Sequence, residues 1–403
     1  MTANAGYHAY ATGDVLTAAQ VQYNLQNQTV MYFATTTARD AALTGAILVE
    51  GMVSYTPATG LMYYNGTAWV SVSGQANTPN LSNPVINSAF QVWQRGTSAF
   101  NPATSTSTGF CADRWQFYRA SFTQFATVSR IATGDTTNLP NIQYASRVQR
   151  TAGDTSTAFL RYLQTFETVN SIPFAGKTVT LSMYARAGAN FSAASSQLGF
   201  TMDYGTGTDQ NYISGFTGDT ALGSAPVLTT TWQRFSFTTT IPATATQLAI
   251  YTGYTPVGTA GANDYYDITG IQLELGSVAT PFDTYATTIQ SELAACQRYY
   301  WRNSGVYGSI GIIQQQTTTL AGTVVPFPVQ MRTTPTLDAN SGTNYFVVKT
   351  LNTANTISGA WTLDVASLTS SEIYITTPTT VAGSAGFAYL NNASAYIGFS
   401  AEL

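Results

Sequence analysis

Short runs in which every second residue is apolar recur along most of this chain, and they constrain its fold more than any other feature. In residues 178–186 the apolar positions are Val179, Leu181, Met183 and Ala185. Successive side chains of a β-strand point to opposite faces, so this period of two indicates strands with one buried face and one wet face. Clusters of Gly, Thr, Asp and Pro separate the runs. The pattern is typical of an all-β sandwich or jelly roll.

The first region, residues 1–76, differs from the rest. A capping box opens a short amphipathic stripe, which predicts a helix over 17–28. Residues 50–72 predict a three-stranded β-meander, with Asn65 and Gly66 as a type I′ hairpin turn that needs positive φ at both residues. The helix and the meander are both too small to be stable alone. We therefore expect this region to pack against other chains, although packing within its own domain is nearly as consistent with the pattern.

Two β domains follow. Residues 77–290 predict a jelly-roll domain, and residues 291–403 predict a second, smaller β-sandwich that begins with a short helix. The chain contains no repeat of fixed period, which disfavours a solenoid or a β-helix.

Charged residues are scarce, and this limits the partners of the chain. They make up 8% of the sequence, the net charge is −4, and Lys177 and Lys349 are the two lysines. Without a basic stripe, we expect no binding to nucleic acid. No apolar run approaches the roughly 20 residues that a membrane span needs, so we expect no membrane insertion. A surface of neutral polar groups is compatible with close packing of subunits, and we expect a homotrimer.

Residues with catalytic or metal-binding chemistry are few. His8 is the single histidine, so the sequence lacks the base of a Ser-His-Asp triad or Cys-His dyad and the ligands of a multi-histidine metal site. Cys111 and Cys296 have neither a zinc spacing nor a disulfide framework, and free buried thiols are favoured over one bridge. The acids are dispersed, although a pair suited to glycoside hydrolysis is not excluded. We expect no enzyme, no metal and no cofactor.

Six short motifs occur in a fixed order through the middle of the chain. They include the sequences NPVINSAFQVWQRG, FAGKTVTLS and IQLELGSVATPF, and they lie at residues 83–96, 112–115, 174–182, 231–235, 271–282 and 296–300. The ordered set resembles the jelly-roll module of many phage tail-fibre and virion structural proteins, which is similar to carbohydrate-binding domains of families 4 and 9. The resemblance covers about half of the chain.

Two further segments resemble phage proteins. Residues 41–72 resemble the attachment regions of minor tail and fibre proteins, and residues 327–335 with 401–403 resemble their distal β domains. The resemblance implies a virion component, usually trimeric, with a tip near the host. We therefore expect assembly in the host cytoplasm, attachment to other tail or capsid proteins through residues 1–76, and a C-terminal domain that faces the host.

The motif residues favour a structural role over contact with a ligand. The tryptophans stand beside core-like positions, and a charge placed in a core must be partnered. The residues of this structural set are Trp93, Arg95, Asp113, Arg114, Trp115 and Glu274.

Receptor binding is expected instead at loops that carry tyrosine. Sugar binding uses exposed rings that stack on pyranose faces, together with amide and carboxylate hydrogen bonds. Asp264 and Asp267 could alternatively hold a structural calcium ion, but two neighbouring acids are more often solvated loop residues. The candidate residues for glycan contact are Tyr204, Tyr212, Tyr251, Tyr254, Asp264 and Tyr265.

These observations favour a phage tail fibre or appendage subunit that adheres to a host-surface glycan. Two alternatives stay open. One is an architectural collar, baseplate or capsid decoration protein without a receptor. The other is a tail-spike polysaccharide depolymerase.

Overall fold

The computed structural model describes residues 15, 17, 30–44, 48–72, 83–97, 108–119, 126–350 and 353–403. It is nearly all β, with 44% strand and 8% helix, so the all-β fold expected from the alternation is confirmed. The chain divides into two compact units, residues 1–80 and residues 81–403. His8 and, apart from Thr17, the helix predicted over 17–28 lie outside the described residues.

The first unit contains the predicted meander within a larger sheet. Its strands pair in the order β1-β2-β3-β4 and span Val30–Tyr32, Val53–Thr56, Gly60–Tyr64 and Trp69–Ser71. Strand β1 runs parallel to β2, and helix α2 (Thr36–Ala42) lies between them in the chain. The Thr35 hydroxyl caps this helix by accepting from the Ala38 amide at 3.1 Å. Neither β1 nor α2 was expected from the alternation, because both elements are short.

The type I′ turn predicted after β3 is wrong. Gly66 has a φ of +90°, but Asn65 is not among the described residues with positive φ. The Asn65 side-chain carbonyl instead accepts from the amides of Thr67 and Ala68 at 3.0 and 2.8 Å. The side chain thus organises a longer loop, which removes the need for a left-handed conformation at Asn65.

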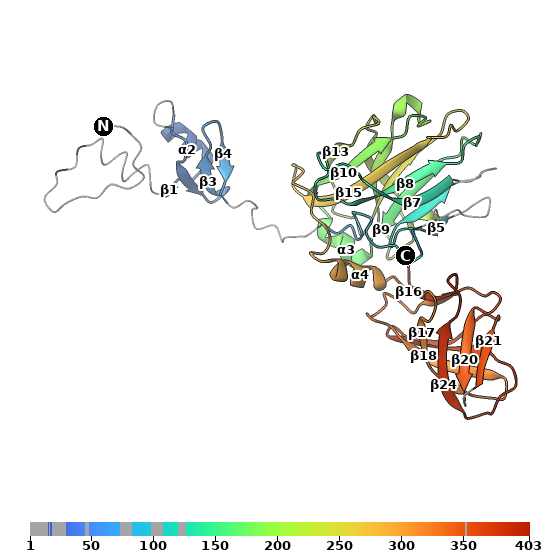
Figure 1. The fold of residues 1–403 in the computed structure, drawn as a ribbon. Coiled ribbons are helices and arrows are strands. Elements are labelled where there is room, and N and C mark those ends of the chain that lie inside the picture. Colours follow the sequence, from blue (N-terminus) through green and yellow to red (C-terminus); the bar gives the residue numbers. More distant parts are fainter. Residues whose placement is uncertain are drawn as a thin grey trace. The chain divides into compact units, whose positions relative to one another are not determined.

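The second unit begins with a two-sheet sandwich (Figure 1). All of its strand pairs are antiparallel. The five-stranded sheet has the order β13-β10-β15-β8-β7, with strands Gln233–Thr240, Thr178–Ala187, Tyr265–Leu275, Tyr144–Arg150 and Ala126–Ala132. The six-stranded sheet has the order β12-β11-β14-β9-β6-β5, with strands Thr220–Ser224, Gly199–Gly205, Gln247–Tyr254, Leu160–Thr165, Gln116–Arg119 and Thr108–Phe110.

The core of the sandwich lies between these sheets. The four apolar residues that defined the alternation in β10 are all fully buried there. The opposite side of β10 is not wet as predicted, because Thr180 and Ser182 are buried as well. Residues 276–283 fold back over this side, and Arg234 bridges the Ser182 hydroxyl (3.0 Å) and the Thr280 carbonyl. A local pattern could not anticipate a cover that comes from a distant segment.

Two more sheets form the C-terminal part of this unit. The three-stranded sheet has the order β16-β25-β19, with strands Tyr300–Ser304, Tyr396–Ser400 and Thr336–Ala339. The seven-stranded sheet has the order β21-β20-β24-β17-β18-β23-β22. Its strands are Thr353–Ile357, Phe346–Thr350, Ala385–Leu390, Ser309–Gln315, Leu320–Pro326, Ser370–Thr376 and Thr362–Ala366. A separate apolar core, which includes Phe346, Ile373 and Phe399, fills the space between them.

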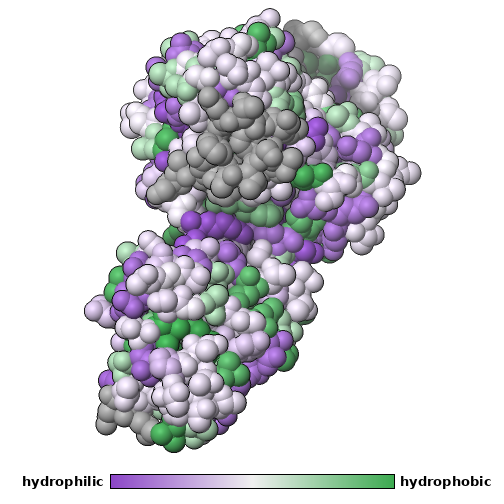
Figure 2. Space-filling view, turned by 90° about the vertical axis from the view of Figure 1, so that its right-hand side faces the viewer, coloured by the Kyte–Doolittle hydropathy of each residue, from purple (hydrophilic) through white to green (hydrophobic). Residues whose placement is uncertain are grey.

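Helices α3 (Thr168–Ser171) and α4 (Ile289–Gln297) lie at the end of the sandwich from which β16 leads to the C-terminal sheets (Figure 1). Leu403 packs there against Tyr299 and Cys296, together with Ile86 and Val92 of the sandwich. Hydrophilic residues line this junction in Figure 2.

Three residues of the predicted structural set, Arg95, Asp113 and Arg114, take part in ion pairs at the junction with Glu402, which was not predicted. Glu402 pairs with Arg114 and, at 3.3 Å, with Arg95, which lies 3.5 Å from Asp113. Glu274 differs, because its carboxylate accepts from the Thr280 amide (3.0 Å) and hydroxyl (2.6 Å) and pairs with no arginine among the described residues. Trp93 and Trp115 are buried in the core.

A second charged network is enclosed within the sandwich. Arg150 contacts Asp264 at 2.8 Å and Asp154 at 3.4 Å, and Asp154 also pairs with Arg119 at 2.5 Å. All four side chains are 0% exposed. Buried charges of this kind are tolerated because each has a partner, so removal of one partner leaves an uncompensated charge in the core.

The change Arg150→Met tests this network. It leaves Asp264 without a cation, and we expect the free energy of unfolding to fall by about 3–5 kcal/mol. Chemical denaturation measures the loss. The change Lys177→Met, at an exposed position, is the control and should alter stability by less than about 0.5 kcal/mol. A similar small effect for both variants would show that the network does not contribute as described.

Candidate binding site

The outer face of the six-stranded sheet gathers polar and aromatic side chains from distant parts of the chain. Strand pairing places Tyr118 of β6 beside Arg161 of β9, and Arg161 beside Gly253 of β14. Two residues before Gly253 on β14, Tyr251 lies beside Thr201 of β11. Their neighbours along each strand, such as Tyr162 and Phe200, point into the core, so these side chains point outward.

A loop folds over one half of this face. Within it, a short 3₁₀ turn (Tyr212–Ser214) begins at Asn211, whose side chain accepts from the Ile213 amide at 2.8 Å. The turn sets the Tyr212 ring on the sheet, stacked on Tyr251 with ring centroids 5.8 Å apart. Phe216 closes the cluster edge-on to Tyr212 at 5.2 Å.

Arg161 lies among three aromatic rings. Its guanidinium carbon is 5.0 Å from the ring centre of Tyr251, 5.1 Å from that of Phe159 and 5.2 Å from that of Tyr212. The Phe159 ring reaches this place because residue 253 is glycine: a Cβ there would lie 2.8 Å from a ring carbon of Phe159. Arg161 is half-buried and forms no ion pair among the described residues, and its Nε lacks a hydrogen-bond partner there. Its charge is therefore stabilised by ring faces without an ion pair, although it interacts electrostatically with Asp203 and Asp219.

Asp203 supplies the acidic group of this site. It is 2% exposed. Its Oδ2 accepts a hydrogen bond from the Tyr212 hydroxyl, and its Oδ1 is buried without a hydrogen-bond partner among the described residues. Burial raises the pKa of Asp203 to about 6, against the lowering effects of Tyr212 and Arg161. Burial likewise raises the pKa of Asp219. Together, Tyr118, Phe159, Arg161, Asp203, Tyr212 and Tyr251 form what we call the Arg161 site.

Two of the six predicted receptor residues, Tyr212 and Tyr251, belong to the Arg161 site. Tyr204 lies on the same strand as Asp203 but turns inward against the sandwich core. The other three lie elsewhere: Tyr254 in the core, Asp264 in the buried network, and Tyr265 under the guanidinium of Arg147 at 3.5 Å.

The expected exposure of these residues is wrong for four of them. Tyr212, Tyr251 and Tyr254 are 3%, 9% and 4% exposed, and Asp264 is 0% exposed. Buried rings in these positions cannot offer their faces to a sugar. In the Arg161 site, the half-exposed rings are those of Tyr118 and Phe159, which the sequence analysis did not select.

The alternative calcium site at Asp264 and Asp267 is also wrong. Asp264 pairs with Arg150, and Asp267 pairs with Arg147 and Arg186, each at 2.8 Å. Each carboxylate already has a cationic partner. The residues that the structure describes contain no group of three or more His, Cys, Asp or Glu side chains arranged to hold a metal ion.

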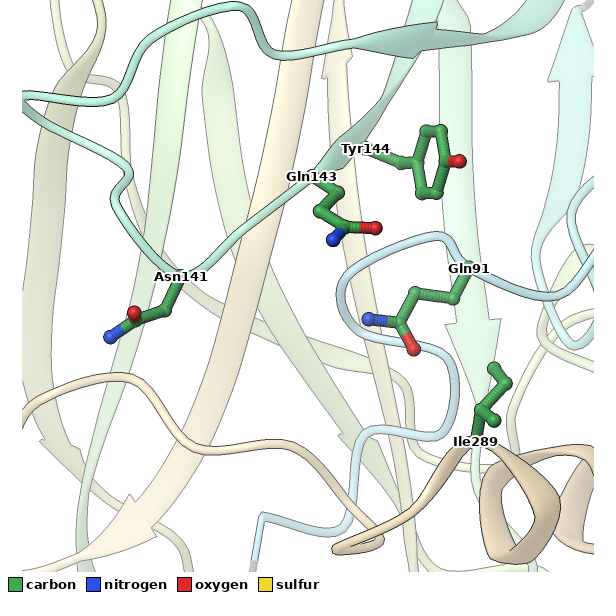
Figure 3. A pocket seen from close by; sticks show the side chains of 5 residues that line it. All are labelled: Gln91, Asn141, Gln143, Tyr144 and Ile289. Carbon is green, nitrogen blue, oxygen red and sulfur yellow. The ribbon is translucent and has the colours of Figure 1, made fainter.

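A hollow lies beside strand β8 of the five-stranded sheet. It has a volume of about 390 Å³ and is lined by Gln91, Asn141, Gln143, Tyr144 and Ile289. In Figure 3 the amide groups of Gln91 and Gln143 extend into this space, while Asn141 turns away from them. The hollow offers neutral hydrogen-bonding groups but no charged side chain in its lining.

None of the helices in the described parts of the chain is long and apolar enough to cross a membrane. The two cysteines, Cys111 and Cys296, are free and buried, and burial raises the pKa of each thiol.

Comparison with known proteins gives similarity in structure alone. No family model matches this chain, and no curated protein matches it. Solved structures that are similar include the enzymatically active domain of bacteriophage CBA120 tailspike protein 4 (12% identity, TM-score 0.30), over 48% of this chain and 21% of that one. They also include a CBM4 structure (14% identity, TM-score 0.28), over 47% of this chain and 98% of that one. A cyclase from Fischerella sp. TAU is similar as well (11% identity, TM-score 0.31), over 49% of this chain and 99% of that one. The match thus spans about a fifth of the tailspike chain. At such low identities and TM-scores, these likenesses carry no argument about function.

The raised pKa of Asp203 predicts a pH-dependent effect of Asp203→Asn. Because the folded-state pKa is about 6 and the ordinary value is 3.8, the folded protein binds more protons than the unfolded one between these values. Its stability therefore falls as the pH rises through this range. Asparagine stays neutral, so the variant should match the natural protein near pH 4 and exceed its free energy of unfolding by roughly 1–3 kcal/mol at pH 7.

Urea denaturation at several pH values measures this difference. Contributions from other titrating groups, such as Asp113, cancel because both proteins contain them. The change Asp364→Asn at an exposed position is the control. A difference between Asp203→Asn and the natural protein that stays constant from pH 4 to pH 7 would contradict the prediction.

Proposed function

We propose that this chain is a structural subunit of a bacteriophage fibre or appendage, and that it binds a glycan on the host surface through the Arg161 site. The proposal includes a homotrimer, attachment to other virion proteins through residues 1–76, and no catalytic role. The ordered motifs of residues 83–300 and their resemblance to virion jelly-roll modules support the assignment to a phage particle. The scarcity of charge, at 8% of residues, supports an assembly of closely packed subunits.

The observation that carries glycan binding is the position of Arg161. A half-buried guanidinium held among rings, without an ion pair in the described parts of the chain, keeps its two terminal nitrogens as donors for a ligand. The half-exposed ring of Tyr118, in the strand beside Arg161, offers a surface for a pyranose ring. A charged donor and an aromatic platform are groups that sugar recognition uses.

Changes at the Arg161 site should weaken binding to glycans of the host surface. Loss of a charged hydrogen bond costs about 1.5–3 kcal/mol, so Arg161→Met should weaken binding by roughly tenfold or more. Loss of ring stacking in Tyr118→Ala should weaken it by about fivefold. Binding of purified host polysaccharide, measured by calorimetry or on a glycan array, tests both changes.

The matched control is Tyr265→Ala, because Tyr265 is a half-buried tyrosine outside the Arg161 site. We expect it to bind like the natural protein. A loss at Tyr265 with full binding by the Arg161 and Tyr118 variants would move the site to the five-stranded sheet. No binding to host cells or glycans by the natural protein would favour the architectural alternative, and turnover of the polysaccharide would favour the depolymerase.

The proposed attachment predicts the effect of removing residues 1–76. Residues 1–80 form a compact unit of their own, so the rest of the chain keeps its internal contacts. We expect the shortened chain to bind cells but to be absent from purified particles, as an immunoblot would show. Normal incorporation would contradict attachment through this region. A deletion of residues 303–403 could not test the role of the C-terminal domain in the same way. It would remove Glu402 from Arg95 and Arg114 and so leave buried charges of the sandwich without their partner.

A further inference from the structure

The outer face of the seven-stranded C-terminal sheet exposes large apolar side chains. Ile312, Phe387, Val365 and Val324 are 73%, 61%, 59% and 57% exposed. Figure 2 shows exposed apolar residues, in green, on the lower body that holds the C-terminal sheets. Scattered apolar residues are normal on a protein surface, but a contiguous group marks an interface.

The register of the strands places these residues in one row. Lys349 of β20 pairs with Phe387 of β24, and Phe387 pairs with Ile312 of β17. The β17–β18 pairing, continued by two residues, sets Ile312 opposite Val324. Val324 pairs with Glu372 of β23, and Glu372 pairs with Val365 of β22. Between Lys349 and Glu372 the row therefore holds three exposed apolar residues, and it continues past Lys349 to Ala354 of β21 and past Glu372 to Val365.

Ile312 lies at the centre of the row, with an apolar residue and then a charged residue on each side. Phe387 and Val324 stand one strand away on either side, and Lys349 and Glu372 stand two strands away. Among the residues that the structure describes, Lys349 forms no ion pair, while Glu372 accepts one hydrogen bond, from Gln316 at 3.2 Å. A second row of the same kind, facing this one with its ends exchanged, would match apolar to apolar and cation to anion.

We propose that this face binds the same face of neighbouring copies of the chain and forms the contact of the homotrimer. Three copies turned inward bring their Ile312 side chains together near the threefold axis. Phe387 then packs against Val324 of the next copy, and Lys349 meets Glu372 of the next copy. Burial of four large apolar side chains in each chain stabilises the assembly, and the single pair of opposite charges sets its register.

The inference rests on the proposed association of three copies, but not on glycan binding or attachment to a particle. It adds a contact surface that lies outside residues 1–76. Closed symmetry satisfies the face in all three copies at once, without open-ended growth.

Engineered disulfides test the contact in the full chain. The double variant Lys349→Cys with Glu372→Cys places thiols on both sides of the three central apolar residues. The two positions are four strands apart, roughly 19 Å at the usual strand spacing, which is too far for a disulfide within one chain. The natural cysteines are buried and their thiol pKa values are raised, so they do not compete.

We expect mild oxidation to give a covalent trimer on a non-reducing gel. The two single variants are the controls and should remain monomers on the same gel. Addition of Ile312→Asp to the double variant should abolish the cross-linked product, because three buried carboxylates would meet near the axis, whereas Thr319→Asp at an exposed turn should not. A covalent dimer as the final product would overturn the threefold arrangement, and an uncrosslinked double variant would overturn the contact.

Sedimentation of the natural protein at micromolar concentration separates this inference from the proposal on which it rests. A monomer would overturn the homotrimer altogether. A trimer in solution without any cross-linked product would leave the homotrimer in place and show that a different surface forms it.

Discussion

The pair of Glu402 with Arg114 is the interaction on which the arrangement of the second unit depends. Arg114 is almost fully buried, with its guanidinium 3.5 Å from the ring centre of Tyr299 and one nitrogen bound to the Thr165 carbonyl at 2.6 Å. A charge in this place is stable only while its partner is present. This partner, Glu402, follows the last strand, β25, and is 288 residues further along the chain than Arg114. The sandwich and the C-terminal sheets therefore stabilise each other at this junction.

Few charges in a chain mean that each one can have a structural task. The buried arginines Arg114, Arg119 and Arg150 each pair with acids that are themselves buried. Arg161 departs from this rule, since rings surround it and it forms no ion pair among the described residues. Lys349 also departs from this rule, because it is an exposed cation beside a row of apolar residues and has no ion pair among the described residues. We base our two functional inferences on these departures, because a charge without an internal partner is available to an external one.

Much of the fold follows from local pattern, whereas the candidate site does not. The alternation in residues 178–186 predicts a strand and its buried side, and the tertiary structure agrees. The same reasoning failed where distant segments intervene, as for Ser182 under residues 276–283 and for Tyr254 in the core. Tyrosine-bearing loops were a reasonable place to look for sugar contacts, but loop sequence does not reveal which way a ring turns. Arg161 gave no signal, because arginine is common on outward positions of strands.

The sequence by itself determined the all-β class, the core-facing residues of the clearest strands, and the need for partners at motif charges such as Arg95 and Asp113. These properties depend on neighbours one or two positions away, or on the cost of burying a charge, and both can be read along the chain. The tertiary structure alone decided that Tyr118, Arg161 and Tyr251 share one face, and that Lys349 and Glu372 lie in one row with three apolar residues between them. Those placements depend on strand order and register, which are set when whole sheets pack against each other and a shift of one residue would turn every side chain to the other face.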